Sequence, residues 1–438
     1  MNATTAVQPN PMMKVLDHRD FRLLWIGQAT SLLGDQFAMI ALPWLVLQLT
    51  NDPLALGIVL ALTGIARVIC MLLGGAAADR ISPRAIMLLT DLFRLVLWAG
   101  MAALVATGAV QLWMIYAFSL GSGIASGFFI PASNAILPRL ISRTDLQAGN
   151  SIFQGTAQLA QSVGPALAGG LIAWFGHTVS GASAASLVGI AVAFAVDACT
   201  FVISVVTLWA MTPQPRVAQS EAAPESVTDA ILDGIRYVWG DPFLRAIVIM
   251  IALVNFVFVG PLTVGVPVLA NTRLLEGAAA YGIIMSAYAL GNLGGILGAG
   301  ALPALDGRRF HFLILGLFIG FGICLAAFGW VRSTGLVAGM LLFLGVGNGY
   351  LAVTLITLLQ RRTPARLMGR MMSLVMVANM GLVPVSQALA GALSRWSLTG
   401  LFEIGGVLMV AMTIFTTFQK ALKPQSLSET LACQPATD

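Results

Sequence analysis

Long apolar runs dominate the sequence, and polar residues gather in the short stretches between them. A helix needs about 20 largely apolar residues to cross a bilayer, and runs of about that length recur along the whole chain. They are too long and continuous for barrel strands, which need only ~9–11 alternating residues. The pattern therefore predicts an all-α membrane protein with twelve transmembrane helices, at residues 21–47, 54–78, 85–107, 110–137, 149–175, 183–211, 243–270, 278–303, 311–331, 334–359, 371–394 and 398–418.

Lysine and arginine residues cluster in every second loop. Loops that face the cytoplasm carry the excess of positive charge, so this alternation indicates orientation. The opposite loops hold only Arg273, Arg332 and Arg395. We therefore expect a multi-pass protein of the cell inner membrane with both termini in the cytoplasm. The clusters on the cytoplasmic side are Lys14, Arg19 and Arg22, Arg80 and Arg84, Arg139 and Arg143, Arg308 and Arg309, Arg361, Arg362, Arg366 and Arg370, and Lys420 and Lys423.

One long polar segment separates the sixth and seventh spans. Its second part, VTDAILDGIRYVW, has apolar residues near helical spacing, which predicts an amphipathic helix along the cytoplasmic face or an extension of span 7. The segment divides the chain into two halves of six helices. The predicted parts are a cytoplasmic N-terminal segment 1–20, a first half 21–211, a cytoplasmic linker 212–242, a second half 243–418 and a cytoplasmic tail 419–438.

The two halves repeat each other weakly. Adding 219 to the residue number carries Arg143-Thr144 to Arg362-Thr363, and it carries Pro165 to Pro384. Paired half-structures are typical of secondary transporters, which bind their substrate near the middle of the membrane between the repeats. The repeat therefore favours a transporter.

Composition supports the membrane assignment and excludes several other classes. The 438-residue chain is 58% hydrophobic and 9% charged, whereas soluble domains are about 25% charged. The net charge of +5 follows the loops and does not form a nucleic-acid-binding patch. The four cysteines show no CxxC or His/Cys spacing, so we expect neither a metal site nor a disulfide framework.

Two related loops point to a family. GAAADRISPR follows span 2 and GALPALDGRR follows span 8, and both resemble the loop G-x-x-x-D-R-x-G-R-R of the major facilitator superfamily. The first copy departs from the family pattern at Ser82 and Pro83, and the second has Ala304 in place of the aspartate. The matching residues are Gly75, Asp79, Arg80 and Arg84 in the first copy, and Gly300, Gly307, Arg308 and Arg309 in the second.

Local phrases are similar to one branch of this family. DHRDFRLLWIGQATSLLGDQF, GFFIPASNAILPRLIS and LMGRMMSL resemble the secretion-effector branch, which includes the enterobactin exporter and macrolide-efflux proteins. SVGPALAGGL in span 5 resembles a signature of the drug–proton antiporters, although three residues rather than two separate its proline from the next glycine. Close helix packing explains the same residues equally well. They are Gly164, Pro165, Gly169 and Gly170.

The resemblance implies roles for particular residues. Asp79 would face the N-terminal end of span 11 in a latch on the cytoplasmic side, although simple pairing with a nearby arginine is the alternative. Spans 1, 4, 7 and 10 would line a cavity, and spans 3, 6, 9 and 12 would lie outside it. We therefore discount Asp197 and Glu403 as substrate contacts. Asp91 and Arg94, near the start of span 3, are expected to snorkel or to pair with loop residues.

Asp35 is the most unusual residue, because it lies near the middle of span 1, where an ionised carboxylate is costly. Arg67 reaches a similar depth in span 2. The pair is either a proton-coupling site that also contacts substrate or a static ion pair between helices. Several amide side chains could bind a ligand or hold helices together, namely Gln28, Gln36, Asn134, Gln154, Gln158, Asn255, Asn292 and Asn348.

The sequence as a whole predicts a secondary active transporter that exports a small organic molecule, drug-like or siderophore-like, by alternating access. We expect the proton gradient to supply the energy without a cofactor or metal. The expected partners are a small-molecule substrate, protons and the lipid bilayer, with no nucleic acid, and the chain is expected to be monomeric. Import or facilitated transport by the same fold is the alternative. An ATP-driven pump and an intramembrane enzyme are disfavoured, because G-x-x-x-x-G-K, HExxH and GxSxG are all absent from the sequence and no catalytic residue is indicated. A scaffold role for a degenerate transporter is disfavoured by the retained Asp79–Arg80 pair and the central Asp35.

Overall fold

The computed structural model describes residues 11–178, 182–212, 236–302, 307–364 and 367–418, and all regular secondary structure among them is helical. This confirms the all-α fold class. The elements in chain order are α1 (Pro11–Asp17), α2 (Arg19–Thr50), α3 (Pro53–Arg80), α4 (Pro83–Ala106), α5 (Leu112–Leu140), α6 (Leu146–Thr178), α7 (Ala182–Ala210), α9 (Pro242–Gly260), the π-helix η1 (Pro261–Gly265), α10 (Val266–Arg273), α11 (Ala278–Ala301), α12 (Gly307–Phe328), α13 (Thr334–Arg362), α14 (Met368–Met380), α15 (Val383–Trp396) and α16 (Leu398–Phe418).

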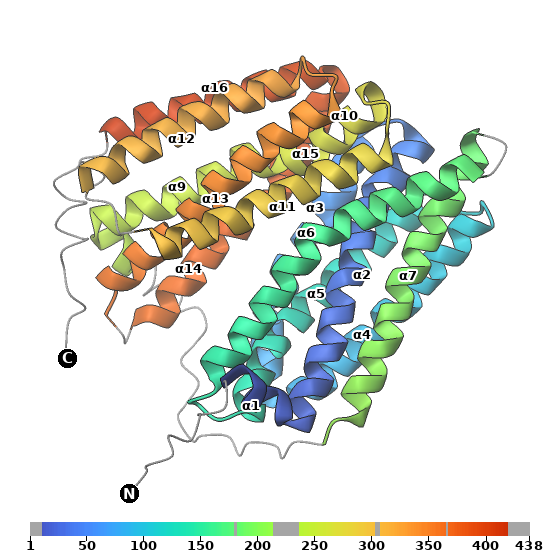
Figure 1. Ribbon diagram of the computed structural model, residues 1–438, viewed down its shortest axis with the longest axis horizontal. Coiled ribbons are helices and arrows are strands. Elements are labelled where there is room, and N and C mark those ends of the chain that lie inside the picture. The colour runs from blue at the N-terminus through green and yellow to red at the C-terminus, as the bar shows by residue number, and fades with distance from the viewer. Residues whose placement is uncertain (1–10, 179–181, 213–235, 303–306, 365–366, 419–438) are drawn as a thin grey trace, which may run out of the picture. The chain divides into compact units, whose positions relative to one another are not determined.

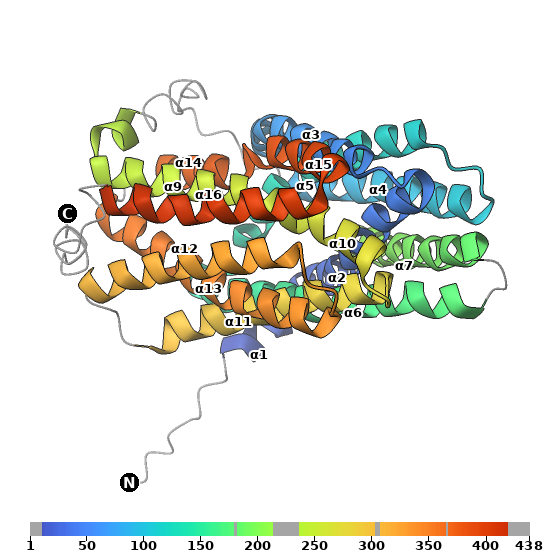
Figure 2. The ribbon, with the colours of Figure 1, turned by 90° about the horizontal axis from the view of Figure 1, so that it is seen from above.

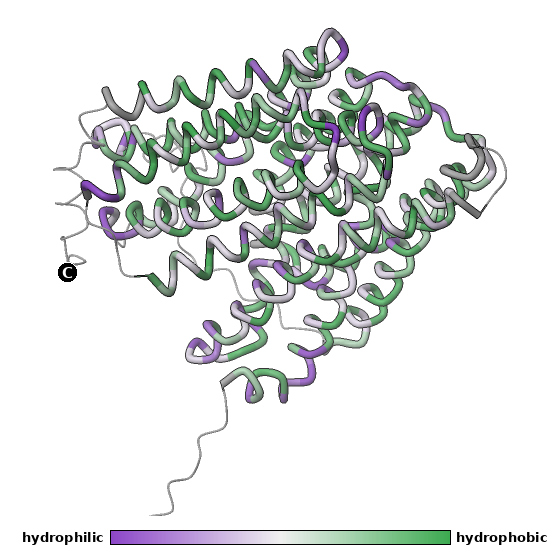
Figure 3. Tube along the Cα trace, turned by 45° about the horizontal axis from the view of Figure 1, so that its top comes forward, coloured by the Kyte–Doolittle hydropathy of each residue, from purple (hydrophilic) through white to green (hydrophobic). Residues whose placement is uncertain are grey.

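The helices are long and apolar enough to cross a membrane. Within the described residues, 11 helical stretches meet this description, and the shorter apolar stretch Leu398–Ile414 of α16 follows them. Together they match the twelve predicted spans. Figure 3 shows hydrophobic residues along the helices and hydrophilic residues mainly at helix ends and turns. The predicted amphipathic helix of the linker falls largely on residues 213–235, which lie outside the described part of the chain.

Two of the predicted spans are interrupted. The stretch Pro242–Arg273 passes from α9 through η1 into α10, and the stretch Met371–Trp396 is divided between α14 and α15. At the first interruption, Ser386 Oγ of α15 donates a hydrogen bond to the Phe256 carbonyl at 2.5 Å and accepts one from the Gly260 amide at 2.9 Å. A side chain inserted between residues i and i−4 opens the helical ladder, and Pro261 contributes no amide donor of its own.

The chain forms two compact units. The first comprises Met1–Leu42 and Ile65–Gln219, and the second comprises Pro43–Gly64 and Ser220–Asp438. Residues 43–64 thus group with the second unit, whereas the sequence division at 212–242 assigns them to the first half. Within the first unit α4 packs along α7, and within the second α12 packs along α16, as Figures 1 and 2 both show. These are the third and sixth spans of each predicted half, so the internal pairing repeats.

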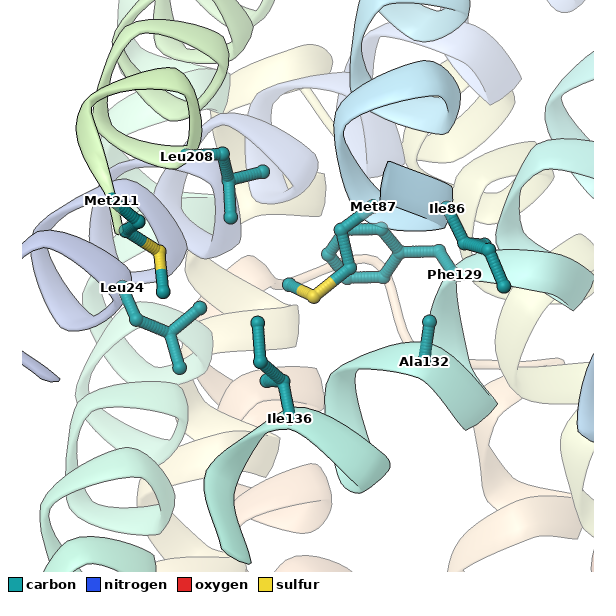
Figure 4. Close-up of a cluster of buried hydrophobic side chains, with 8 residues drawn as sticks. All are labelled: Leu24, Ile86, Met87, Phe129, Ala132, Ile136, Leu208 and Met211. Carbon is teal, nitrogen blue, oxygen red and sulfur yellow. The ribbon is translucent and has the colours of Figure 1, made fainter. Parts of the chain in front are cut away.

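An apolar cluster joins four helices of the first unit. Leu24 of α2, Met87 of α4, Phe129 of α5 and Leu208 of α7 are among its buried members, and Figure 4 shows their side chains converging. Lipid tails are as apolar as these residues, so the cluster holds the helices together by close van der Waals packing rather than by escape from water. It fixes α2, α4, α5 and α7 at one end of the bundle.

The most extensive helix pair in the second unit, α11 with α13, depends on glycine. A Cβ atom on Gly291 or Gly295 of α11 would lie 2.0 Å from the carbonyl oxygen of Leu342 or Val346 on α13. The two backbones are therefore in direct contact, as is common where membrane helices carry small residues one turn apart.

Candidate functional site

Five ionisable side chains form a buried charge cluster in the first unit. The cluster consists of Asp35 on α2, Arg67 on α3, Asp91 and Arg94 on α4, and Asp197 on α7, and each interacts electrostatically with others of the set. The side chains of Asp91 and Asp197 are 0% exposed and that of Arg94 is 7% exposed. The structure thus adds three charged residues to the two that the sequence singled out.

Arg94 is held in the charge cluster by contacts with side chains of α5 and α7. Its Nη2 atom donates a hydrogen bond to Ser126 Oγ on α5 at 2.7 Å. Its guanidinium also lies over the rings of Phe129 and Phe201, at 4.9 and 5.6 Å from their centroids. The expectation that Asp91 and Arg94 snorkel is therefore wrong. Their i, i+3 spacing puts both on the one face of α4 that turns inward, and this spacing was a signal in the sequence.

The opposite face of α4 explains why the inward turn is favourable. Leu89 is 65% exposed and Val96 is 64% exposed on that face, whereas Asp91 and Arg94 are buried. In a bilayer the exposed face contacts lipid, so apolar residues outside and charges inside are the stable arrangement. The pattern is the reverse of that of a soluble helix.

Hydroxyl groups on α7 support the two buried aspartates. Ser204 Oγ donates to Asp91 Oδ2 at 2.6 Å, and Thr200 Oγ1 lies 3.4 Å from Asp197 Oδ1. Other buried atoms in the cluster have no hydrogen-bond partner in the described part of the chain, namely Arg67 Nε, Asp91 Oδ1 and Asp197 Oδ2. Buried polar atoms without a partner are rare in proteins and often mark sites where charge or protons change.

Asp35 differs from the other two carboxylates. It is partly exposed, and within the described residues its carboxylate accepts no hydrogen bond and forms no ion pair within 4.0 Å. Arg94 and Arg67 both oppose its negative charge. The three carboxylates and two guanidiniums carry a net charge of −1 when all are ionised. A single proton therefore makes the cluster neutral.

An open pocket of about 390 Å³ lies in the same unit. We call it the amide pocket, because amide side chains dominate its polar wall. The predicted residues Gln28, Asn134 and Gln154 line it, and Ser133 and Asn150 complete the polar part. The apolar part is Leu24, Met87, Leu137 and Phe153. Sequence reasoning missed Ser133 and Asn150, because single polar residues near helix ends are common.

The amide pocket and the charge cluster occupy the same faces of the same helices. Gln28 and Asp35 are seven residues apart on α2, Met87 and Arg94 are seven apart on α4, and Ser133 and Ser126 are seven apart on α5. Seven residues are two helical turns, or about 10 Å along the axis. The charge cluster therefore lies about two turns from the pocket, further along three of its helices.

A second pocket, of about 90 Å³, lies in the second unit between α9, α12, α13 and α14. The predicted residues Asn255 and Asn348 line it together with Asn379. Two of these amides are paired, because Asn255 Nδ2 donates to Asn379 Oδ1 at 3.2 Å and to the Ile251 carbonyl at 2.9 Å. The predicted Gln36 lines neither pocket. It is 8% exposed and packs against Gly164 on α6.

The loop motif is only partly described. The side chains of Asp79 and Arg80 lie outside the described residues, as do that of Arg370 and any contact of Gly75, so the predicted latch stays a prediction. Arg84 is described: its Nε and Nη2 atoms donate to the carbonyls of Leu208 and Trp209, both at 2.7 Å. These carbonyls belong to the last turn of α7, where a cation is favourable. In the second copy Gly300 lies in the last turn of α11, Gly307 begins α12, and Arg308 and Arg309 are exposed.

The glycines of the span-5 motif lie in different surroundings on α6. A Cβ on Gly164 would lie 2.5 Å from Gln36 Cβ of α2, so this glycine lets the two helices touch. Pro165 lies inside α6, Gly169 is buried, and Gly170 has no atom within 4 Å of its would-be Cβ. The first glycine is therefore required by close packing with α2, whereas Gly170 is not required by packing. Elsewhere, the discounted Glu403 is exposed and accepts a hydrogen bond from Trp330 Nε1 at 3.2 Å.

Comparison with known proteins gives consistent results. An uncharacterized MFS-type transporter, y4rN, of Sinorhizobium fredii is 30% identical over 299 residues, which are 67% of this chain and 68% of the relative. The enterobactin exporter EntS of Salmonella typhi is 26% identical over 390 residues, 86% of each chain. Among solved structures, a D-xylose–proton symporter superposes with a TM-score of 0.69 at 16% identity, covering 93% of this chain and 98% of the other.

A nucleoside transporter, NupG, superposes with a TM-score of 0.66 at 14% identity, covering 95% of this chain and all of the other. At 16% and 14% identity, these structural similarities show the fold alone. The sequence model of the Major Facilitator Superfamily matches residues 24–386, which extend from the first predicted span into the eleventh and include both loop motifs. The chain is therefore a membrane transporter of the major facilitator superfamily and not an enzyme.

Proposed function

We propose that the protein exports small organic molecules across the bacterial inner membrane and that protons drive the export. The observation that carries this proposal is the buried cluster of three carboxylates and two guanidiniums beside the amide pocket. Its charge changes from −1 to neutral with one proton, and its position lets a bound molecule influence that change. The enterobactin exporters among the relatives support the outward direction.

Asp35 is the proton carrier in this proposal. Asp91 and Asp197 are fully buried and interact with hydroxyl groups, whereas Asp35 is partly exposed and has no hydrogen-bond partner in the described part of the chain. A proton can therefore reach Asp35 most easily. Arg94 and Arg67 stabilise its ionised form, and the cost of an unpaired charge in the membrane favours the protonated form. Two opposing effects of this kind make a protonation switch possible.

Transport by reconstituted protein tests the proposal. In proteoliposomes with an imposed pH gradient, Asp35→Asn should abolish uphill transport of a radiolabelled compound that the wild type moves, while downhill equilibration of the same compound persists. Asp17→Asn is the matched control, because Asp17 is exposed on α1. Wild-type uphill transport by Asp35→Asn would exclude Asp35 as the carrier, and the proton-coupling group would then lie elsewhere.

The proposed orientation has its own test. Cysteines placed at Asn51 or Arg332, in a variant without native cysteines, should react with an impermeant maleimide added to whole cells. A cysteine at Arg143 should react only after the membrane is opened. The reverse labelling pattern would contradict cytoplasmic termini.

A further inference from the structure

We propose that the amide pocket binds an uncharged part of the substrate that carries several hydroxyl, carbonyl or amide groups. The transported molecules are then uncharged and rich in hydrogen-bonding groups, and they are not lipophilic cations. This inference rests on the proposed transport function and deepens it by naming the substrate class. Three features of the pocket carry it: the absence of charge on its walls, its unpaired amides, and its separation from the charge cluster.

The walls of the amide pocket carry no charged side chain. All nine lining residues are described, and they are five uncharged polar residues and four apolar ones. A ligand that fills the pocket exchanges contacts with water for contacts with these walls. A charged group would lose its hydration without gaining a counter-charge, which is strongly unfavourable. An uncharged group loses less and recovers hydrogen bonds.

The amides of this pocket are available for a ligand. Gln28 Nε2 is buried and has no hydrogen-bond partner among the described residues. Within the described part of the chain, the side chains of Asn134, Asn150 and Gln154 also make no hydrogen bond to protein groups, and all three are exposed in the pocket. In the second unit, by contrast, Asn255 and Asn379 bond to each other. Among the described residues, all four amides of the first pocket lack a protein partner, whereas two amides of the second pocket bond to each other, and this difference favours the first pocket as a recognition site.

The polar and apolar walls together define an amphiphilic ligand. Each amide offers both a donor and an acceptor, so it matches hydroxyl and amide groups equally well. Phe153 is held edge-on by Phe21 at a centroid distance of 5.6 Å, and it offers an apolar surface beside the amides. A ring or short apolar body with hydrogen-bonding substituents on one side fits this combination.

The charge cluster does not convert the pocket into a cation site. Asp35 lies two helical turns, about 10 Å along α2, from Gln28. Its negative charge is already opposed by Arg94 and Arg67. A cation that reached Asp35 would also replace the proton that drives transport. Separate positions for substrate and proton therefore predict that removing the charge of Asp35 leaves binding intact.

Binding to the purified full-length protein in detergent tests this inference. Chloramphenicol is an uncharged probe with an amide, two hydroxyls and an aromatic ring, and tetraphenylphosphonium is a cationic probe without hydrogen-bonding groups. Equilibrium dialysis of both radiolabelled probes should show that wild type binds chloramphenicol and binds tetraphenylphosphonium at least about tenfold more weakly, because a pocket built for hydrogen bonds discriminates against molecules that leave them unmade.

Variants of the pocket sharpen the test. Gln28→Leu and Asn134→Leu should each weaken chloramphenicol binding about 5- to 50-fold, since each removes hydrogen bonds and keeps a similar volume. Gln48→Leu is the matched control, because Gln48 is an exposed glutamine on α2 that lies outside the amide pocket. Gln28→Glu should weaken chloramphenicol binding and strengthen tetraphenylphosphonium binding, because it supplies the missing counter-charge.

Several outcomes would overturn the inference. They are failure of wild type to bind chloramphenicol, tighter binding of tetraphenylphosphonium than of chloramphenicol, and unchanged chloramphenicol binding in both leucine variants. Failure of the proposed function appears elsewhere, because binding in detergent needs no proton gradient. Asp35→Asn should bind chloramphenicol like wild type whether or not it transports, and lost binding in this variant would contradict separate substrate and proton positions.

Discussion

Gly34 of α2 and Asp197 of α7 are in direct contact: a Cβ atom on Gly34 would lie 2.4 Å from Asp197 Oδ1 and 2.2 Å from Thr200 Oγ1. Gly34 immediately precedes Asp35 in the chain. The glycine thus makes room for a buried carboxylate next to the proposed proton carrier. α2 therefore contributes to the charge cluster in two ways: Asp35 supplies a carboxylate, and Gly34 leaves space for the carboxylate of Asp197.

Gly34→Ala should disturb the charge cluster while α2 stays helical. The added methyl group must displace the Asp197 and Thr200 side chains, and overpacking of this kind costs about 1–3 kcal/mol. We expect a lower unfolding temperature in detergent and reduced proton-driven transport. Gly170→Ala is the control, since no atom lies within 4 Å of its would-be Cβ. Equal effects of the two substitutions would show that the contact with Asp197 is unimportant.

Arg94→Gln should be among the most destabilising single changes in the first unit. It removes the buried cation whose charge opposes those of Asp91, Asp35 and Asp197, together with the hydrogen bond to Ser126, and buried carboxylates without a compensating cation are strongly destabilising. We expect little folded protein, measured as the monodisperse fraction in size-exclusion chromatography. Adding Asp91→Asn should restore part of it, because the uncompensated charge is then gone. Arg143→Gln, at an exposed position, should behave like wild type.

Arg84→Gln should destabilise the first unit through the end of α7. The arginine donates two hydrogen bonds to the last turn of that helix, and a charged donor there contributes about 1–3 kcal/mol. The unfolding temperature should fall for Arg84→Gln and much less for Arg308→Gln, which changes the exposed arginine of the second motif copy. A transport defect with unchanged thermal stability would instead favour a purely conformational role for Arg84.

An ion pair should hold α1 to the loop before α6 in a pH-dependent manner. Lys14 Nζ lies 3.2 Å from Asp145 Oδ1, and hydrogen bonds from Ser142 and Lys14 hold the pKa of the Asp145 carboxyl below its ordinary value of 3.8. Because the pKa of Asp145 is lowered in the folded state, the ion pair stabilises the attachment of α1 fully above pH 3.8. This stabilisation is lost as the pH falls through the lowered pKa.

Hydrogen exchange of residues 12–17 measures this attachment. At pH 7, Asp145→Asn should speed exchange there about 2- to 5-fold, as expected for a surface ion pair. The effect of the substitution should disappear at a pH below the lowered pKa of Asp145. Asp20→Asn serves as a comparison that leaves the Lys14 pair intact. A substitution effect that is constant over this pH range would exclude the ionised carboxylate as its cause.

Ser386→Ala should loosen the interrupted helix at η1. The serine hydroxyl bridges the Phe256 carbonyl and the Gly260 amide, and its removal leaves both groups without that partner. We expect a loss of about 1–3 kcal/mol, measured by urea unfolding, unless the helix closes its own hydrogen bond. Ser386→Cys keeps a weak donor of similar size, so its free energy of unfolding should lie between those of wild type and Ser386→Ala. Faster hydrogen exchange limited to residues 256–261 would locate the effect.

The amino-acid sequence by itself determined the membrane spans and the family. Continuous apolar runs separated by short turns leave few alternatives to transmembrane helices, since every backbone polar group must be satisfied inside the bilayer. The paired loop motifs then indicated the major facilitator superfamily. The sequence also indicated Asp35, because a charge in mid-span is costly and needs a reason.

Tertiary structure alone decided which other residues accompany Asp35. Apolar residues cover both the lipid-facing and the inward-facing sides of these helices, so hydrophobic periodicity does not separate the two faces. Asp91 and Arg94 near the start of span 3 therefore resembled loop-facing charges, although both are buried beside α5 and α7. The bridging position of Ser386 and the contact between Gly34 and Asp197 depend on residues 130 and 163 positions apart in the chain, and only the packing of the helices brings such residues together.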